Sequence, residues 1–154
     1  MAKKKEEEYS KSISNRKARF EYEILDTFQT GLILKGTEVK SIRKGKASLE
    51  DSFALLKNGE VYLENMNISP YELGNIHNHD PRRSRKLLMH KSEIEKLRYD
   101  VSDSGLTLIP LRLYFNDRGK AKIELALAKG KKLHDKRDSI RKRDAERELR
   151  RGGE

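Results

Sequence analysis

Apolar and polar residues alternate with a period of two in several segments of this chain, which predicts strands that bury one face and leave the other in water. Residues 20–34 interleave aromatic and β-branched residues with polar ones and predict one or two strands. Residues 51–65 predict a hairpin, because Asn58 and Gly59 separate two apolar runs and this dipeptide favours a tight two-residue turn.

A second hairpin is predicted for residues 106–115 and 120–128, which flank a polar turn at residues 116–119. In its second strand four apolar residues alternate with charged ones: Ala121, Ile123, Leu125 and Leu127. Such strict alternation is typical of a strand that packs on a core with one face only.

Two segments carry helical signals instead. Residues 36–43 begin with Thr37 as a start residue and Glu38 as an acid in the first turn, and Gly45 ends the segment. Ser92 begins a capping box in front of apolar residues at helical spacing, which predicts a helix over about residues 93–101. About six antiparallel strands with two or three short helices predict a mainly β fold. A closed, OB-like antiparallel barrel is the natural form, since closure leaves no exposed strand edge.

The composition indicates an anionic partner. The 154 residues include 35 Lys or Arg against 25 Asp or Glu, which gives a net charge of +10. This charge favours nucleic acid or an anionic membrane, and no apolar run approaches the roughly 18 residues that a membrane span needs. We therefore interpret the charge as nucleic-acid binding without a membrane. The chain has no cysteine and its first residues lack the apolar segment of a secretory signal, so we expect a cytoplasmic protein.

Both ends of the sequence look different from the segment between them. Residues 1–14 mix positive and negative side chains without periodicity, which predicts a flexible arm. Residues 15–129 are then predicted to form the barrel. Residues 130–154 form a strongly basic tail with too few apolar residues to dock on the barrel. Asp138 with Lys142, and Glu146 with Arg150, have the i,i+4 spacing of helical charge pairs. We therefore predict a tail that is disordered when free and helical when bound.

The densest cationic cluster lies near the middle of the chain, where four cations fall within five positions: Arg82, Arg83, Arg85 and Lys86. In an extended segment Arg83 and Arg85 share one face, and Lys86 lies on the other. Arginine's planar fork favours phosphate contact, and the alternative is a solvated charge run. Glu38 has two interpretations as well, as an acid at a helix start or as an acceptor for base amino groups. Asn15 and Lys17 are either turn residues or part of an RNA clamp.

Histidines offer a competing interpretation. His77, His79 and His90 lie close together in the sequence near Asp80, which suggests a metal site or a His-dependent nuclease. No nucleophile motif, phosphate-binding loop or zinc-protease motif accompanies them, so we expect hydrogen-bonding or stacking roles and no metal, cofactor or catalytic residue.

Five blocks of sequence resemble the SmpB family of proteins, which bind transfer-messenger RNA (tmRNA). They cover essentially the whole chain, in order: ISNRKA at 13–18, GTEVKSIR at 36–43, NHDPRRSRKLL at 78–88, PLRLYF at 110–115 and LAKGKKLHDKR at 127–137. The resemblance implies an OB-like barrel and a bacterial ribosome-rescue adaptor that is no enzyme. It would bind the tRNA-like domain of tmRNA and bring it to the A site of stalled ribosomes.

The resemblance also implies site residues and partners. The tmRNA-contact positions of the family fall on Asn15, Lys17, Glu38, Arg82, Arg85, Lys86 and Leu88. The tail positions expected to contact the ribosome, at the decoding centre and messenger channel, are Lys131, Lys132, His134, Asp135, Lys136 and Arg137. Elongation factor Tu is the implied partner in the delivery complex, and the protein would be a monomer. From the residues alone, a general single-stranded RNA-binding OB-fold protein remains the alternative, although the chain has no Trp and only ten Phe and Tyr for a stacking platform.

Overall fold

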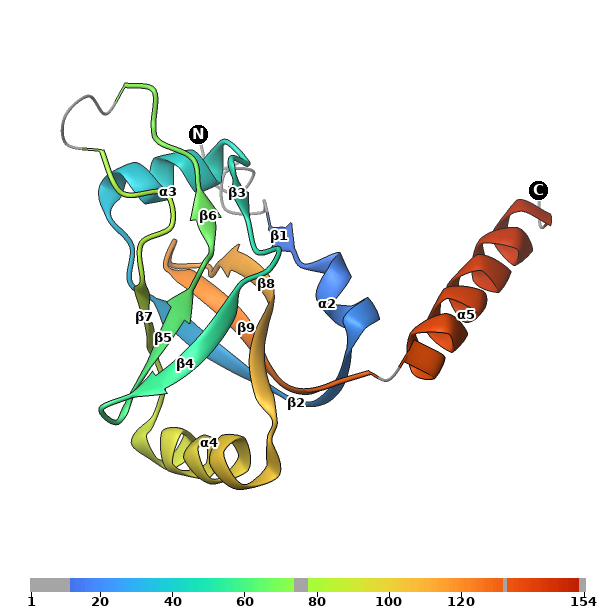
Figure 1. Ribbon diagram of the computed structural model, residues 1–154. Coiled ribbons are helices and arrows are strands. Elements are labelled where there is room, and N and C mark those ends of the chain that lie inside the picture. The colour runs from blue at the N-terminus through green and yellow to red at the C-terminus, as the bar shows by residue number, and fades with distance from the viewer. Residues whose placement is uncertain (1–11, 74–77, 132, 153–154) are drawn as a thin grey trace.

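The computed structural model describes residues 12–73, 78–131 and 133–152, with side chains for all of these except 103–104, 133–139 and 152 (Figure 1). The described strands are β1 (Ile13–Ser14), β2 (Tyr22–Leu32), β3 (Ala47–Ser48), β4 (Phe53–Lys57), β5 (Glu60–Glu64), β6 (Asn67–Ile68), β7 (Arg85–Leu88), β8 (Thr107–Phe115) and β9 (Ala121–Gly130). The described helices are α2 (Arg16–Glu21), α3 (Gly36–Arg43), α4 (Lys91–Ser104) and α5 (Leu133–Gly152).

Six strands form a closed antiparallel ring. Their order is β8-β4-β5-β7-β2-β9, and pairing of β9 with β8 closes it. β1 adds to the edge of β8, and β3 pairs with β6 in a separate two-stranded sheet. Strands in a closed ring have no free edge along most of their length, so a short chain can satisfy its backbone without covering helices. The prediction of a mainly β fold with about six antiparallel strands is confirmed.

Both predicted hairpins are confirmed. Asn58 and Gly59 have φ of 52° and 75°, the left-handed values that a two-residue turn between right-twisted strands needs. They join β4 to β5 with Lys57 opposite Glu60. In the turn between β8 and β9 the side-chain oxygen of Asn116 accepts hydrogen bonds from the backbone N–H groups of Arg118 and Lys120, at 3.1 and 2.9 Å.

The core fills the inside of the ring. Strand residues such as Val61, Leu63 and Ile123 are fully buried there, and Ile42 of α3 and Leu97 of α4 pack against the same cluster. Figure 1 shows α3 and α4 at opposite ends of the ring, where each closes one opening.

A second, smaller cluster lies outside the ring, where α2 covers the outer face of β8 and β9. It joins Ala18 of α2 to Ile109, Leu111, Ala126 and Ala128. These two strands are therefore buried on both faces over part of their length. The prediction that the second strand of the hairpin buries one face only is wrong for residues 125–128, all of which are buried.

Several details differ from the sequence predictions. Residues 20–21 were expected in a strand but belong to α2, which begins after Asn15, and residues 33–34 lie beyond the end of β2. Ile13 and Ser14 were placed in the flexible arm but pair with β8, so the folded part begins earlier than residue 15. Residues 1–11 of the arm lie outside the described residues. The predicted helix over 93–101 is longer, and its capping box joins His90 and Glu93, not Ser92 and Glu95.

The tail is helical in this structure, whereas the sequence predicted disorder in the free protein. α5 projects away from the ring beyond the end of β9 (Figure 1). It contacts the body at α2, where the guanidinium of Arg143 lies 5.4 Å from the ring centre of Phe20. Between residues 131 and 151 there is no Gly or Pro, and Arg, Lys, Glu and Ala favour helix strongly. None of the described helices is long and apolar enough to cross a membrane.

Candidate nucleic-acid interface

Glu38 is the centre of the network beneath the basic segment. Its side chain is fully buried at the start of α3, where one carboxylate oxygen accepts from the backbone N–H of Lys35 at 2.7 Å. The same oxygen accepts from Arg83 at 2.7 Å, and the other accepts from Nε of Arg85. Burial acts to raise the pKa of Glu38, but the hydrogen bonds from Arg83, Lys35 and Arg85 outweigh it and hold the pKa below its ordinary value.

Arg85 is buried as completely as Glu38. It points inward from β7, and its terminal nitrogens donate to the carbonyl oxygens of Met66 at 2.7 Å and Pro81 at 3.2 Å. A guanidinium keeps its charge under these conditions, so it needs both the carboxylate and the carbonyls to compensate for lost water. Arg85 therefore ties β7, α3 and the segment before β7 together.

The residues before β7 form an ordered turn on this network. The side chain of Asp80 accepts from the backbone N–H of Arg82 at 2.9 Å, and the side chain of Arg82 donates to Asn65 at 2.7 Å. His79 is buried, with its two ring nitrogens 2.9 Å from the hydroxyl of Thr37 and 2.9 Å from the carbonyl of Ile68. The turn thus holds Arg82 at the surface.

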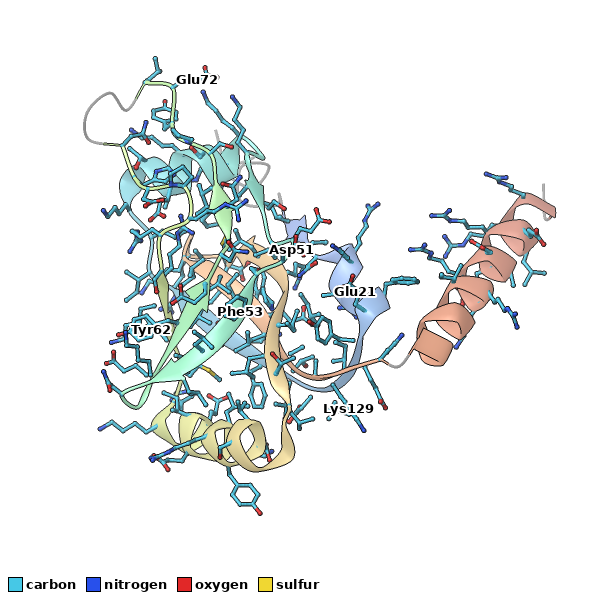
Figure 2. The ribbon with its side chains drawn as sticks, viewed as in Figure 1. Glu21, Asp51, Phe53, Tyr62, Glu72 and Lys129 are labelled. Atoms are coloured by element: carbon cyan, nitrogen blue, oxygen red, sulfur yellow. The ribbon has the colours of Figure 1, made fainter. Side chains whose placement is uncertain are left out.

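The side chains of Lys86 and Leu88 point to the outside of the ring, whereas those of Arg85 and Leu87 are buried. The ammonium of Lys86 donates to Glu60 at 2.8 Å, which raises the pKa of Lys86 and lowers that of Glu60. Tyr62, labelled on the outer side of β5 in Figure 2, donates to the other oxygen of Glu60 at 2.7 Å. Leu88 is 52% exposed and lies over Gly31, where an added Cβ would come within 3.2 Å of it.

Asn15 and Lys17 occupy different environments although they are two residues apart. Asn15 is buried: its amide nitrogen donates to the carbonyls of Leu49 and Pro110, and its oxygen accepts from Ala18 at the start of α2. Lys17 is exposed and surrounded by acids: it lies 3.3 Å from Asp51, 3.7 Å from Glu50 and 3.9 Å from Glu21. Figure 2 shows Glu21 and Asp51 on adjoining parts of the surface.

The predicted tmRNA-contact residues therefore divide into two groups. Asn15, Glu38 and Arg85 are buried and have their hydrogen-bonding groups bonded within the protein, and their contact with RNA stays a prediction. Lys17, Arg82, Lys86 and Leu88 reach the surface and stay candidates for contact. Glu38 has a structural role in this structure, because it caps α3 and pairs with two arginines.

The predicted tail residues are only partly described. Lys131 is half-buried and its backbone N–H donates to Glu21 at 3.0 Å. Lys132 lies outside the described residues. The backbone of His134, Asp135, Lys136 and Arg137 forms the first turns of α5, and their side chains lie outside the described part.

Sequence reasoning missed the role of Arg83. Arg83 lies two residues before Arg85, and side chains two apart in an extended segment point to the same side. Both guanidinium groups therefore reach the carboxylate of Glu38. The signal was present in the two-residue spacing, but the partner lies 45 residues earlier in the chain. The role of Asn15 as the N-cap of α2 was also missed, although Asn is among the preferred residues for that position.

The histidine interpretation receives no support from the described geometry. His77 lies outside the described residues, and both ring nitrogens of His79 lie within hydrogen-bonding distance of protein groups. His90 precedes α4 and is exposed. Within the described part of the chain, no group of three or more His, Asp or Glu could hold a metal ion.

Comparison with known proteins identifies the family. The family model described as SmpB protein matches residues 12–153. The chain belongs to the SmpB family. The SsrA-binding protein of Desulforudis audaxviator is 67% identical over 135 residues, which are 88% of each chain. That of Chlorobaculum tepidum is 60% identical over 142 residues, covering 92% of this chain and 90% of the other.

A solved structure of the family agrees with the fold. It is described as "tmRNA-SmpB: a journey to the center of the bacterial ribosome" and is 52% identical in sequence, with a TM-score of 0.69. The match covers 84% of this chain and 94% of that chain. The fold described above is therefore the one that this family member has.

Proposed function

We propose that this chain is the adaptor of trans-translation: it binds the tRNA-like domain of tmRNA and delivers it to the A site of stalled ribosomes. The observation that carries the proposal is the 60–67% identity to SsrA-binding proteins over about nine-tenths of both chains. The family model matches residues 12–153, which include the ring, its basic segment and all but the last residue of the tail. The net charge of +10 agrees with a partner made of RNA.

The ring is the tmRNA-binding part of this proposal, and we take it as an OB-like barrel within residues 13–130. Arg82, Lys86, Lys17 and Leu88 would contact the RNA, and the buried Glu38 and Arg85 would fix the shape of the surface. Preorganised cations bind a structured RNA with a smaller loss of side-chain entropy than free ones. This arrangement therefore favours a folded tRNA-like domain over any single strand.

The tail, residues 130–154, is the ribosome-binding part. Lys131, Lys132, His134, Asp135, Lys136 and Arg137 would contact small-subunit RNA at the decoding centre and in the empty messenger channel. A solvated basic helix fits a channel lined by phosphates only when no messenger occupies it, so occupancy itself would be the signal. In the delivery complex elongation factor Tu would be the further partner. The adaptor would act as a cytoplasmic monomer, without catalysis, cofactor, metal or membrane.

A binding assay separates this function from its alternatives. The full chain is incubated with three labelled RNAs: the tRNA-like domain, an unstructured single strand of equal length, and a duplex. Tight and selective binding of the tRNA-like domain without cleavage is expected. Equal binding of the single strand would instead identify a general single-stranded RNA-binding OB-fold protein. Cleavage that is abolished in His79→Ala would identify a nuclease.

A further inference from the structure

The wall of the ring is open along one side of β4. β4 pairs with β5 over its whole length, from Phe53 to Lys57. Among the described residues, however, it pairs with β8 at one position only, where Ala54 lies opposite Leu108. The part of β4 beyond Ala54 therefore has no neighbouring strand on that side. Figure 1 shows the tip of the β4–β5 hairpin and α4 at the same end of the ring.

The backbone groups that face the open side belong to Leu56. Lys57 lies opposite Glu60 across the two-residue turn, and the residues that close such a turn exchange ladder hydrogen bonds with each other. The direction of these bonds alternates along a strand, so Leu55 bonds to β5, whereas Ala54 and Leu56 face the other way. Within the described part of the chain, no backbone hydrogen bond joins Leu56 to β8 or to the segment before it. Its N–H and C=O are thus a donor and an acceptor without a strand partner.

A groove of about 670 Å3 lies between this edge and α4. The hairpin forms one wall with Leu55, Leu56 and Gly59, and α4 forms the other with one helix face. Ile94 and Val101 of that face are only partly buried, although both pack against the core of the ring. The groove therefore places apolar side chains next to backbone groups that need partners.

An extended polypeptide has the chemistry that this groove requires. Its backbone presents an N–H and a C=O to the same side at every second residue, as an added strand does. In strand addition the main chain supplies the hydrogen bonds, and pockets beside the edge take alternate side chains. A nucleic acid lacks this regular alternation of donors and acceptors, and its phosphates would lose water against apolar side chains.

We propose that the groove between β4 and α4 binds an extended segment of a protein partner. The segment adds to the open edge of β4, pairs with Leu56, and places apolar side chains at alternate positions against Ile94 and Val101. This goes beyond the proposed function, which assigns RNA to the ring and no protein, and it does not depend on that function.

Hydrogen exchange of the free chain, followed by NMR, tests the edge itself. The amide of Leu56 should exchange about tenfold or more faster than those of Leu55 and Lys57, whose N–H groups bond to β5. Equal protection of the three amides would overturn the proposal, because the edge would already be closed. A dimer in light scattering that protects Leu56 would overturn it as well, since a second copy of the chain would then occupy the groove.

Disulfide capture tests the occupant. The chain has no cysteine, and Glu95 and Lys96 are neighbouring exposed residues of α4, of which only Glu95 lines the groove. Glu95→Cys and the matched control Lys96→Cys, each in the full chain, are incubated with a mixture of peptides of about eight residues that carry one central cysteine and varied flanks. Glu95→Cys should retain peptides with alternating apolar residues at a reductant concentration about tenfold higher than Lys96→Cys does. Equal retention by the two variants would overturn the proposal.

Backbone methylation of a retained peptide distinguishes strand addition from apolar contact alone. Methyl groups on one alternate set of backbone nitrogens should abolish retention, because these N–H groups face β4, whereas methyl groups on the other set should leave it unchanged. The bound peptide should also slow exchange of the Leu56 amide about tenfold and leave that of Leu55 as it was. Equal effects of the two methylated sets, or displacement of the peptide by a single-stranded RNA of equal length, would contradict binding by strand addition.

Discussion

Two basic regions of this chain arrange their cations in opposite ways. In residues 82–86 each Arg and Lys donates to an acceptor elsewhere in the protein: Arg82 to Asn65, Arg83 and Arg85 to Glu38, and Lys86 to Glu60. The described side chains of α5 are those of residues 140–151; no ion pair forms among them, and every one of these residues is exposed. Similar composition thus produces one surface with fixed shape and one helix that a partner can reshape.

The difference indicates how each region meets RNA. A preorganised surface loses little side-chain entropy on binding and suits a partner of fixed shape, such as a tRNA-like fold. A solvated helix of about twenty residues is marginal by itself, so its environment decides how much of it persists. We therefore assign capture of tmRNA to the ring and response to the ribosome to α5.

The largest expected effect comes from removing residues 131–154. The shortened chain keeps the ring and should bind the tRNA-like domain within about threefold of the full chain, because the surface around β7 lies far from α5 and distant sites act independently. Peptide tagging on stalled ribosomes should be abolished, since the part proposed to enter the decoding centre is gone. Filter binding and a tagging assay on the same preparations measure both. Equal loss of tmRNA affinity and tagging would contradict the proposal that the ring binds tmRNA and α5 binds the ribosome.

A smaller effect, on folding, is expected from Glu38→Ala. The substitution leaves Arg85 buried without its carboxylate, and breaking a buried pair in this way costs about 3 to 5 kcal/mol. Urea unfolding followed by circular dichroism measures this destabilisation. Glu60→Ala, which breaks the solvated pair with Lys86, is the control and should change stability much less. Similar losses in the two variants would mean that Glu38 is no more important than a surface acid.

Next in size is the effect of Arg82→Gln with Lys86→Gln. The double variant should fold normally and bind tmRNA more weakly, with a log–log salt slope lower by roughly 0.7 to 0.9 for each phosphate that is no longer neutralised. Arg85→Gln should instead lower thermal stability, because its guanidinium donates to the carbonyls of Met66 and Pro81 from inside. An unchanged slope in the double variant would remove Arg82 and Lys86 from the interface.

The smallest expected effect is on pH dependence. Because the folded-state pKa of Glu38 lies below its ordinary value of 4.5, its charge stabilises the fold fully above pH 4.5. This stabilisation is lost as the pH falls through the lowered folded-state value. The free-energy difference between the unaltered chain and Glu38→Gln should therefore be constant above pH 4.5 and shrink below it. A difference that stays constant or grows on acidification contradicts the network described here.

Local signals were enough to predict much of the fold. Asn58-Gly59, the alternation over residues 121–125 of β9 and the short helix ended by Gly45 each depend on neighbouring residues, and all three are confirmed. α2 was missed because its six residues bury only Ala18 among residues of mixed character. Such a short helix depends on packing against β8, which local periodicity does not reveal.

The interface was predicted less completely than the fold. A run of four cations is typical of a solvated surface, and the burial of Arg85 depends on Glu38, 47 residues away. The resemblance implied a set of positions but not whether each one contacts RNA or holds another residue in place. Only the contacts in the folded structure show that Arg82 and Lys86 reach the surface, whereas Arg85 and Glu38 are buried against each other.

Hydroxyl-radical footprinting of tmRNA and ribosomal RNA together tests the central claim most directly. The full chain is compared with the chain ending at Gly130, each in complex with tmRNA and a stalled ribosome. We expect the shortened chain to keep the protections on the tRNA-like domain and to lose those on small-subunit RNA. Loss of the tmRNA protections, or retention of those on ribosomal RNA, would contradict the assignment of tmRNA to the ring and the ribosome to α5.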